Sequence, residues 1–238
     1  MTGLTGVTKI AAGGLFSLAL RSDGTVWAWG YNAVGELGNG TTADSNVPVQ
    51  VTGLARITAI AAGEGDSAMA IRTYPKTGVT SVWTWGSNDA GQLGDGTLSS
   101  HLVPEQVTGI GARGIVGIAV GDGFELALGA DGSVWAWGAD SFGQLGIGPQ
   151  FTRFTRPVQA IAAGSGIIQL AAGVNHALAV RSNGTVLAWG KNSYGELGLG
   201  NTDPAGGPVQ VSGLGGASQV TAGWEFTLAL YVPPFVFE

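Results

Sequence analysis

A tryptophan-bearing segment recurs four times in the chain, and it constrains the fold more than any other feature. Trp29, in Trp-Ala-Trp-Gly, is matched further along by Trp85, Trp137 and Trp189, at steps of 56, 52 and 52 residues. Short apolar stretches surround each of these tryptophans. A period of about 50 residues built from short strands is typical of a β-propeller or of another repeat architecture.

The first unit indicates how each repeat folds. Asp23-Gly24 lies between its second and third apolar stretches, and this dipeptide favours a tight hairpin. Both faces of the third stretch are apolar, with two tryptophans on one and Val26 and Ala28 on the other. Such a sheet must be covered on both faces, which stacking of sheets around an axis achieves. The predicted strands cover residues 9–13, 17–20, 25–30 and 48–51.

The repeats predict one domain over residues 1–238. Its 43 glycines recur at fixed places in the units, which marks them as turn residues and argues against disorder. Phe235 to Phe237 is either the third strand of a last blade or a strand that pairs with another copy or partner. The expected units are residues 5–54, 55–110, 111–161, 162–214 and a partial fifth at 215–238.

These motifs resemble the regulator of chromosome condensation repeat family. The resemblance rests on Ala-Ala-Gly, Leu-Ala-Leu, Asp-Gly, Trp-x-Trp-Gly and Gly-Glu/Gln-Leu-Gly-x-Gly, which recur along nearly the whole chain. It implies an all-β fold, a β-propeller of four-stranded blades. Family members usually close with seven blades, whereas this chain has four full repeats and a partial fifth.

Composition and motifs argue against several kinds of chemistry. The formal charge of −6 and the sequence pI of about 4.8 give no basic surface for nucleic acid. No apolar run approaches the ~20 residues of a membrane span, so no membrane insertion is expected. With no cysteine and two histidines, His101 and His176, at non-equivalent places, no metal site is predicted. No nucleophile and base come together, so we expect neither catalytic residues nor a cofactor.

The segment Gly35 to Gly40 is a possible phosphate-binding loop by composition. A phosphate-binding loop precedes a helix N-terminus. Here the segment recurs four times and no helical pattern follows it. We therefore predict a structural turn.

Strand polarity predicts where a protein partner binds. In an up-and-down blade, the loop between strands one and two lies at the same end as the loop between strands three and four. These loops vary between units, whereas their flanking residues repeat, and they offer aromatic and acidic side chains suited to protein contacts. An alternative is that they vary because nothing constrains them. The candidate contact residues are Leu15, Phe16, Tyr31, Glu64, Asp66, Asp89, Phe124, Glu125, Phe142, Asn175, His176, Tyr194 and Trp224.

The leading hypothesis is a non-catalytic β-propeller that binds a protein through these loops. A second is a structural component of an assembly, such as a cell-surface or virion protein, joined as a homo-oligomer through its terminal strand edges. The family resemblance adds a guanine nucleotide exchange factor and a secreted enzyme inhibitor. No residue identifies the compartment, and an extracellular, cell-surface or virion location is favoured over the cytoplasm.

Overall fold

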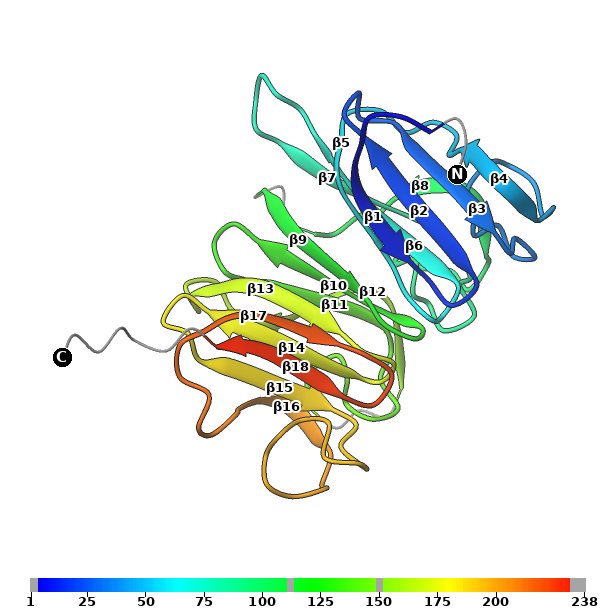
Figure 1. Cartoon of the computed structure of the whole chain (residues 1–238). Helices are drawn as coiled ribbons and strands as arrows, with labels where there is room; N and C mark the ends of the chain where they lie inside the picture. Colours follow the sequence, from blue (N-terminus) through cyan, green and yellow to red (C-terminus); the bar gives the residue numbers. More distant parts are fainter. Residues whose placement is uncertain (1–3, 111–113, 149–151, 232–238) are drawn as a thin grey trace.

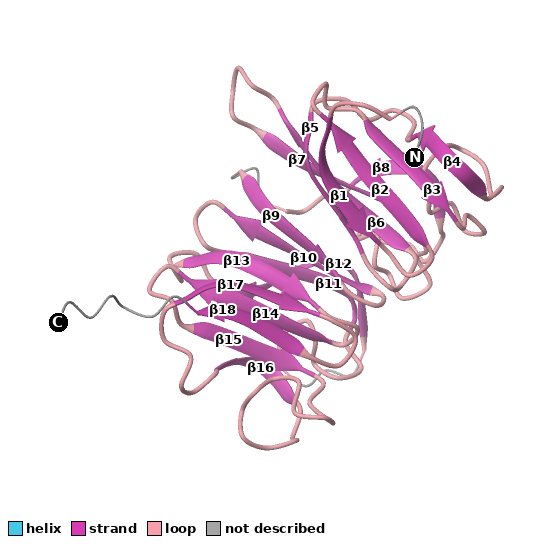
Figure 2. Ribbon diagram, in the orientation of Figure 1, coloured by secondary structure: helices cyan, strands magenta, loops and turns pink. Residues whose placement is uncertain are grey.

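The computed structural model describes residues 4–110, 114–148 and 152–231, whose strands form five antiparallel sheets (Figure 1). No helix occurs in these ranges (Figure 2). Four sheets have four strands and the last has two, which confirms the predicted propeller of four full repeats and part of a fifth.

Blade 1 contains β1 (Val7–Ala12), β2 (Phe16–Arg21), β3 (Val26–Gly30) and β4 (Ser45–Gln50). Blade 2 contains β5 (Ile57–Ala62), β6 (Ser67–Thr73), β7 (Thr80–Gly86) and β8 (His101–Gln106). Blade 3 contains β9 (Ile115–Val120), β10 (Phe124–Gly129), β11 (Val134–Ala139) and β12 (Arg153–Ile161). Blade 4 contains β13 (Ile167–Ala172), β14 (His176–Arg181), β15 (Val186–Gly190) and β16 (Ala205–Gln210), and blade 5 contains β17 (Ala217–Ala222) and β18 (Thr227–Tyr231).

The blades fan out around one axis as an open arc (Figure 1). Within each blade the strands follow chain order from the inside outward. Four of the five inner strands end in alanine, which lets the five strands approach one another around a central cavity of about 140 Å³. Among the described residues, no hydrogen-bonded pairing joins the first sheet to the last. The inner-strand residues that line the cavity are Ala12, Ala62, Val120, Ala172 and Ala222.

The Asp-Gly pairs form the hairpins predicted for them. Asp23 Oδ1 accepts hydrogen bonds from the N–H and the hydroxyl of Thr25 at 3.0 and 2.6 Å. Gly24 has a φ of 78°, a conformation that glycine adopts without strain. Its carbonyl accepts the N–H of Ile57 in the next blade at 3.1 Å, so the turn also joins two blades.

The tryptophans of the repeat lie between successive blades. Trp85, Trp137 and Trp189 are fully buried, and each indole N–H donates to a main-chain carbonyl of the preceding blade. Trp29 is only partly buried, because no described sheet precedes blade 1. The carbonyls belong to Glu36, Gln92 and Gln144, at 2.9, 2.7 and 2.8 Å respectively.

The glycine-rich segment is a structural turn, as predicted. Buried Asn32 organises it: Oδ1 accepts the N–H of Leu37 at 2.9 Å, and Nδ2 donates to the Ala43 carbonyl at 2.9 Å. The N–H of Gly40 then donates to the carbonyl of Leu102 in the next blade at 2.9 Å. The turn thus ties neighbouring blades together. Asn88 and Asn192 occupy the same position in blades 2 and 4.

Candidate interaction surface

The two predicted series of loops meet at one end of the blades, which we call the loop end. In blade 1 the N–H of Tyr31 donates to the carbonyl of Leu15 at 3.0 Å. The same bond joins the two loops of the next three blades, at 2.8 to 2.9 Å. The expected strand polarity is therefore confirmed. The further donor–acceptor pairs are Ser87–Asp66, Ala139–Gly123 and Lys191–Asn175.

Nine of the thirteen candidate residues are accessible at the loop end. Tyr194 and Trp224 are the most open aromatic residues there, with 72% and 67% of their surface exposed. Asp66 and Asn175 are partly buried and the others are exposed. The remaining accessible candidates are Leu15, Tyr31, Glu64, Asp89 and Phe142.

The expectation that the other four are accessible is wrong. Phe16, Phe124, Glu125 and His176 are 0 to 3% exposed, because they begin the second strand of a blade and turn inward. The aromatic rings at 16, 124 and 176 lie over the glycine that ends the preceding Ala-Ala-Gly or Ala-Val-Gly motif, where a Cβ would collide with them. These three rings are core, whereas Phe226 makes the same contact with Gly223 but is 54% exposed.

Glu125 is a buried carboxyl between blades. Neither of its carboxyl oxygens has a hydrogen-bond partner among the described residues. Burial raises the pKa of Glu125 well above its ordinary value, against the smaller opposing effects of Ser67 and Trp137. The side chain therefore favours the neutral acid, and it is unsuited to bind a basic partner.

Blades 2 and 3 gather carboxylates at the loop end. Partial burial raises the pKa of Asp66, and the charges of Asp122, Glu64 and Asp89 raise it further. Burial and then the charge of Asp89 raise the pKa of Asp122. These four residues, the acidic patch, thus lie close enough to repel one another, and a cationic side chain between them would relieve this repulsion.

Blades 3 to 5 carry an aromatic patch around one cation. Lys191 Nζ lies 2.6 Å from Glu225 Oε1 and 5.3 Å from the centre of the Tyr194 ring. It also lies 6.0 Å from the centre of the Phe142 ring. The hydrogen bond to Glu225 is the main cause of the raised pKa of Lys191. We define the aromatic patch as Phe142, Lys191, Tyr194, Trp224 and Glu225.

Sequence reasoning placed Asp122, Lys191 and Glu225 in the variable loops but did not include them among the candidate contact residues. Each lies in one of the variable loops, but no sequence spacing indicates that Lys191 of blade 4 meets Glu225 of blade 5. Their proximity arises from the stacking of blades. The described ranges contain no group of three or more metal-binding side chains. They also contain no helix long and apolar enough to cross a membrane.

The fold defines a β-propeller built from repeated blades with a loop-rich end. The chain matches the RCC1-like domain model over residues 1–232, and it belongs to that family. Ultraviolet-B receptor UVR8 of Arabidopsis thaliana is 33% identical over 228 residues, which are 94% of this chain and 50% of UVR8. Human E3 ubiquitin-protein ligase HERC2 is 34% identical over 213 residues, 88% of this chain and 4% of HERC2. The chain thus spans half or less of the length of these two relatives.

Solved structures show the same fold. Human WBSCR16 superposes with a TM-score of 0.86 at 24% identity, over 99% of this chain and 60% of that one. Prp20p of Saccharomyces cerevisiae superposes with a TM-score of 0.78 at 24% identity, over 96% of this chain and 57% of that one. At 24% sequence identity, these superpositions show a shared fold and nothing about a shared function.

Proposed function

We propose that the chain is a non-catalytic interaction module that binds a protein partner through its loop end. The observation that carries the proposal is the joint presence of the acidic patch and the aromatic patch on one end of a rigid scaffold. Exposed aromatic side chains supply contact area at little entropic cost, and charges steer the partner. The partner surface that fits has basic residues beside an apolar patch.

Relatives with the same fold support binding in general terms. The structure of Prp20p is described together with its binding to Gsp1p and histones. A further structure is of yeast RCC1 bound to Kap60. These are properties of those proteins. For this chain they favour a protein ligand over a small molecule.

The test uses a photoactivatable amino acid placed at Tyr194 and, as the control, at Lys76. Lys76 lies in the hairpin between β6 and β7, which is at the other end of the blades (Figure 1). In the source cells we expect a discrete crosslinked species from position 194 and none from 76. That species should disappear when Glu64, Asp66 and Asp89 are changed to serine. Equal crosslinking from both positions, or no effect of the serines, would refute the proposal.

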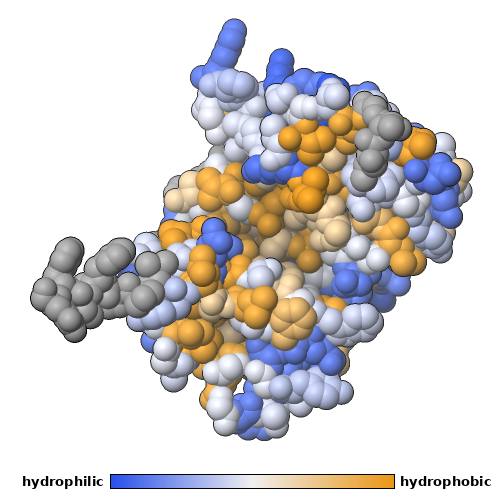
Figure 3. Space-filling view, viewed as in Figure 1, coloured by the Kyte–Doolittle hydropathy of each residue, from blue (hydrophilic) through white to orange (hydrophobic). Residues whose placement is uncertain are grey.

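A structural role in an assembly is the second candidate. It is favoured by apolar side chains on both terminal sheets, where Ile10 of β1 is 78% exposed and Leu228 of β18 is 58% exposed. Apolar residues also spread over both halves of the hollowed face in Figure 3. Sedimentation velocity separates the two candidates: a monomer at all concentrations favours the interaction module, and ordered oligomers favour assembly. In the part of the chain that the structure describes, no feature favours the exchange-factor or enzyme-inhibitor alternatives.

A further inference from the structure

Each of the first three blades forms a socket for the indole of the next blade. In blade 1 the socket holds Trp85, whose N–H bonds to the carbonyl of Glu36 and whose ring lies against Gly38. Trp137 and Trp189 lie in the same way against Gly94 and Gly146. The apolar residues in the same cluster as Trp85 include Val26, Leu37, Val51 and Leu54 of blade 1.

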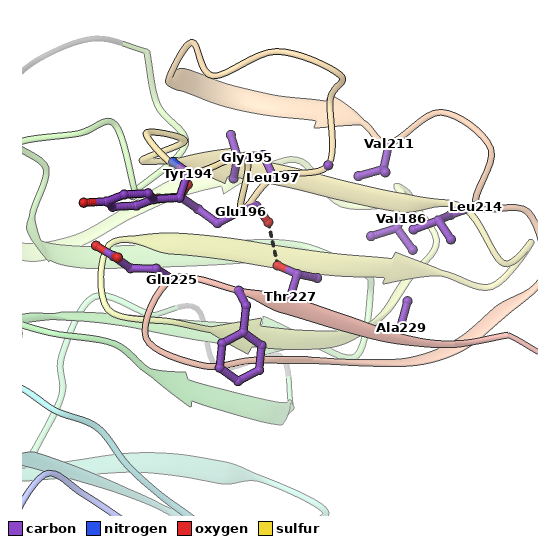
Figure 4. A pocket seen from close by; sticks show the side chains of 12 residues that line it. Val186, Tyr194, Gly195, Glu196, Leu197, Val211, Leu214, Glu225, Thr227 and Ala229 are labelled. Carbon is purple, nitrogen blue, oxygen red and sulfur yellow. Dashed lines mark hydrogen bonds between the residues drawn. The ribbon is translucent and has the colours of Figure 1, made fainter.

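Blade 4 has the same socket, but here it is open. The residues at the four corresponding positions line a cavity of about 410 Å³, together with Glu196 and Gly198 (Figure 4). A Cβ on Gly198 would meet only a methyl group of Val211, at 3.4 Å, where the three equivalent glycines would each meet an indole. We call this cavity the indole recess. The residues at the four corresponding positions are Val186, Leu197, Val211 and Leu214.

The recess lies beside an open strand edge. In blades 1 to 4 the second strand pairs with a tryptophan-bearing third strand, so that Ala177 lies opposite Trp189. Among the described residues, β18 pairs only with β17. Thr227 of β18 is the counterpart of Ala177, and Thr227 and Ala229 line the recess (Figure 4).

The hydrogen-bond acceptor of the socket is also in place. The Thr227 hydroxyl donates to the Glu196 carbonyl at 2.7 Å, which is the carbonyl that an indole N–H would use in this blade. A carbonyl oxygen accepts two hydrogen bonds, so a second donor can approach. The recess therefore continues the contact already present between blades 4 and 5 and has the acceptor, the glycine and the apolar walls of an indole site.

We propose that the indole recess binds a tryptophan on an extended segment of a partner polypeptide, which adds to β18 as an antiparallel strand. Main-chain pairing supplies affinity and the recess supplies specificity, as in other cases of β-strand addition. The fitting pattern is Trp-x-Trp-Gly, with the second tryptophan in the recess. A second copy of this chain is not the occupant, because the strands that carry the pattern, β3, β7 and β11, are each already paired on both edges. The recess adjoins the aromatic patch, since Tyr194 and Glu225 also line it, but it is tested apart from the loop-end proposal by variants of β18 and of the peptide.

The probe is a fluorescently labelled peptide with the sequence of residues 24–32, Gly-Thr-Val-Trp-Ala-Trp-Gly-Tyr-Asn. We expect saturable one-to-one binding to the whole chain by fluorescence anisotropy. A peptide with alanine at the second tryptophan should bind at least tenfold more weakly. Hydrogen exchange of the β18 amides should slow when the first peptide binds. Equal affinity of the two peptides would overturn the proposal.

A matched pair of variants locates the site. Ala229→Trp fills the recess from β18, whereas Leu228→Trp places the same ring on the opposite, exposed face of that strand. We expect at least tenfold weaker binding for the first variant and unchanged binding for the second, with melting temperatures checked for both. Loss of binding only in Tyr31→Ser/Phe142→Ser, two loop-end residues that do not line the recess, would assign the peptide to the loop end and refute the proposal. Binding seen only after Phe235→Ser/Phe237→Ser would show that the chain occupies its own recess, and would also refute it.

Discussion

The indole N–H of Trp85 donates to the main-chain carbonyl of Glu36 at 2.9 Å, across 49 residues of sequence. Both groups are buried between blades 1 and 2. The same bond recurs at Trp137 and Trp189, so it is a repeated contact between neighbouring blades. The fold thus uses one side chain both to fill an apolar socket and to satisfy a buried carbonyl.

Replacing Trp85 with phenylalanine should destabilise the chain, whereas Trp29→Phe should have almost no effect. The first change leaves the Glu36 carbonyl without its donor, at a cost of about 1 to 3 kcal/mol. The Trp29 indole donates to no described residue and is partly exposed. Trp29→Phe should therefore change the free energy of unfolding by no more than about 0.5 kcal/mol. Urea denaturation followed by circular dichroism measures both. Equal losses would show that the bond itself contributes nothing.

Asp140→Asn should stabilise blade 3 at neutral pH. Asp140 occupies the place of Asn32, Asn88 and Asn192; its Oδ1 accepts the N–H of Leu145 at 3.0 Å, and its buried Oδ2 has no described partner. Burial raises its pKa from 3.8 to about 6. A raised carboxyl pKa means that stability is present at low pH and is lost as the pH rises through about 6. We expect the free energy of unfolding of the variant to exceed that of the parent by about 1 kcal/mol at pH 7.5 and by little at pH 4.5. A gain of the same size at both pH values would contradict this assignment.

Glu125→Gln should also stabilise the chain, and more so as the pH rises. Because the pKa of Glu125 is raised by burial, the folded state holds a proton that the unfolded state releases near pH 4.5. The glutamine removes that linkage, and we expect a gain of about 1 kcal/mol or more above pH 7. Glu105→Gln on exposed β8 is the matched control and should change nothing. The measurement is urea denaturation from pH 5 to pH 8, and a loss of stability at pH 8 would contradict the prediction.

His176→Phe should remove a destabilisation that appears in acid. Burial lowers the pKa of His176, and its Nε2 lies 3.2 Å from the Thr227 hydroxyl. A lowered histidine pKa means that stability present above pH 6.5 is lost as the pH falls through the folded-state pKa. Phenylalanine stands at the equivalent positions 16, 124 and 226. Between pH 7.5 and pH 5, the free energy of unfolding should therefore fall by about 1 kcal/mol less in the variant than in the parent. Urea denaturation at the two pH values measures this difference. Parallel pH profiles would show that His176 does not titrate on unfolding.

The repeat pattern allowed the fold to be predicted in detail. The recurrence of Trp29 at 85, 137 and 189 and the Asp-Gly turns determine strand order, hairpins and the polarity of the loops. Local patterns carry this information, since each blade repeats the same covalent spacing. Burial at the loop end was harder to predict. Phe16 and Phe124 begin their strands beside exposed loop residues. Their rings are nevertheless buried, because they pack over Gly13 and Gly121.

Contacts between blades were the least predictable part. Lys191 and Glu225 meet at 2.6 Å because blades 4 and 5 stack, and no spacing within one repeat encodes that meeting. The indole recess is similar. It becomes visible only when the residues of blade 4 are compared with those that hold Trp85 in blade 1.

The open arc has a consequence for cooperativity. Among the described strands, blade 3 is covered on both sides, whereas blades 1 and 5 each have one neighbouring sheet. In a closed ring every blade supports, and is supported by, two others, and the ring melts as one body. Here each link depends only on the adjacent one, so that loss of an outer sheet uncovers the next, as in a linear array of repeats. The five described blades thus combine a ring-forming architecture with the sequential energetics of a solenoid.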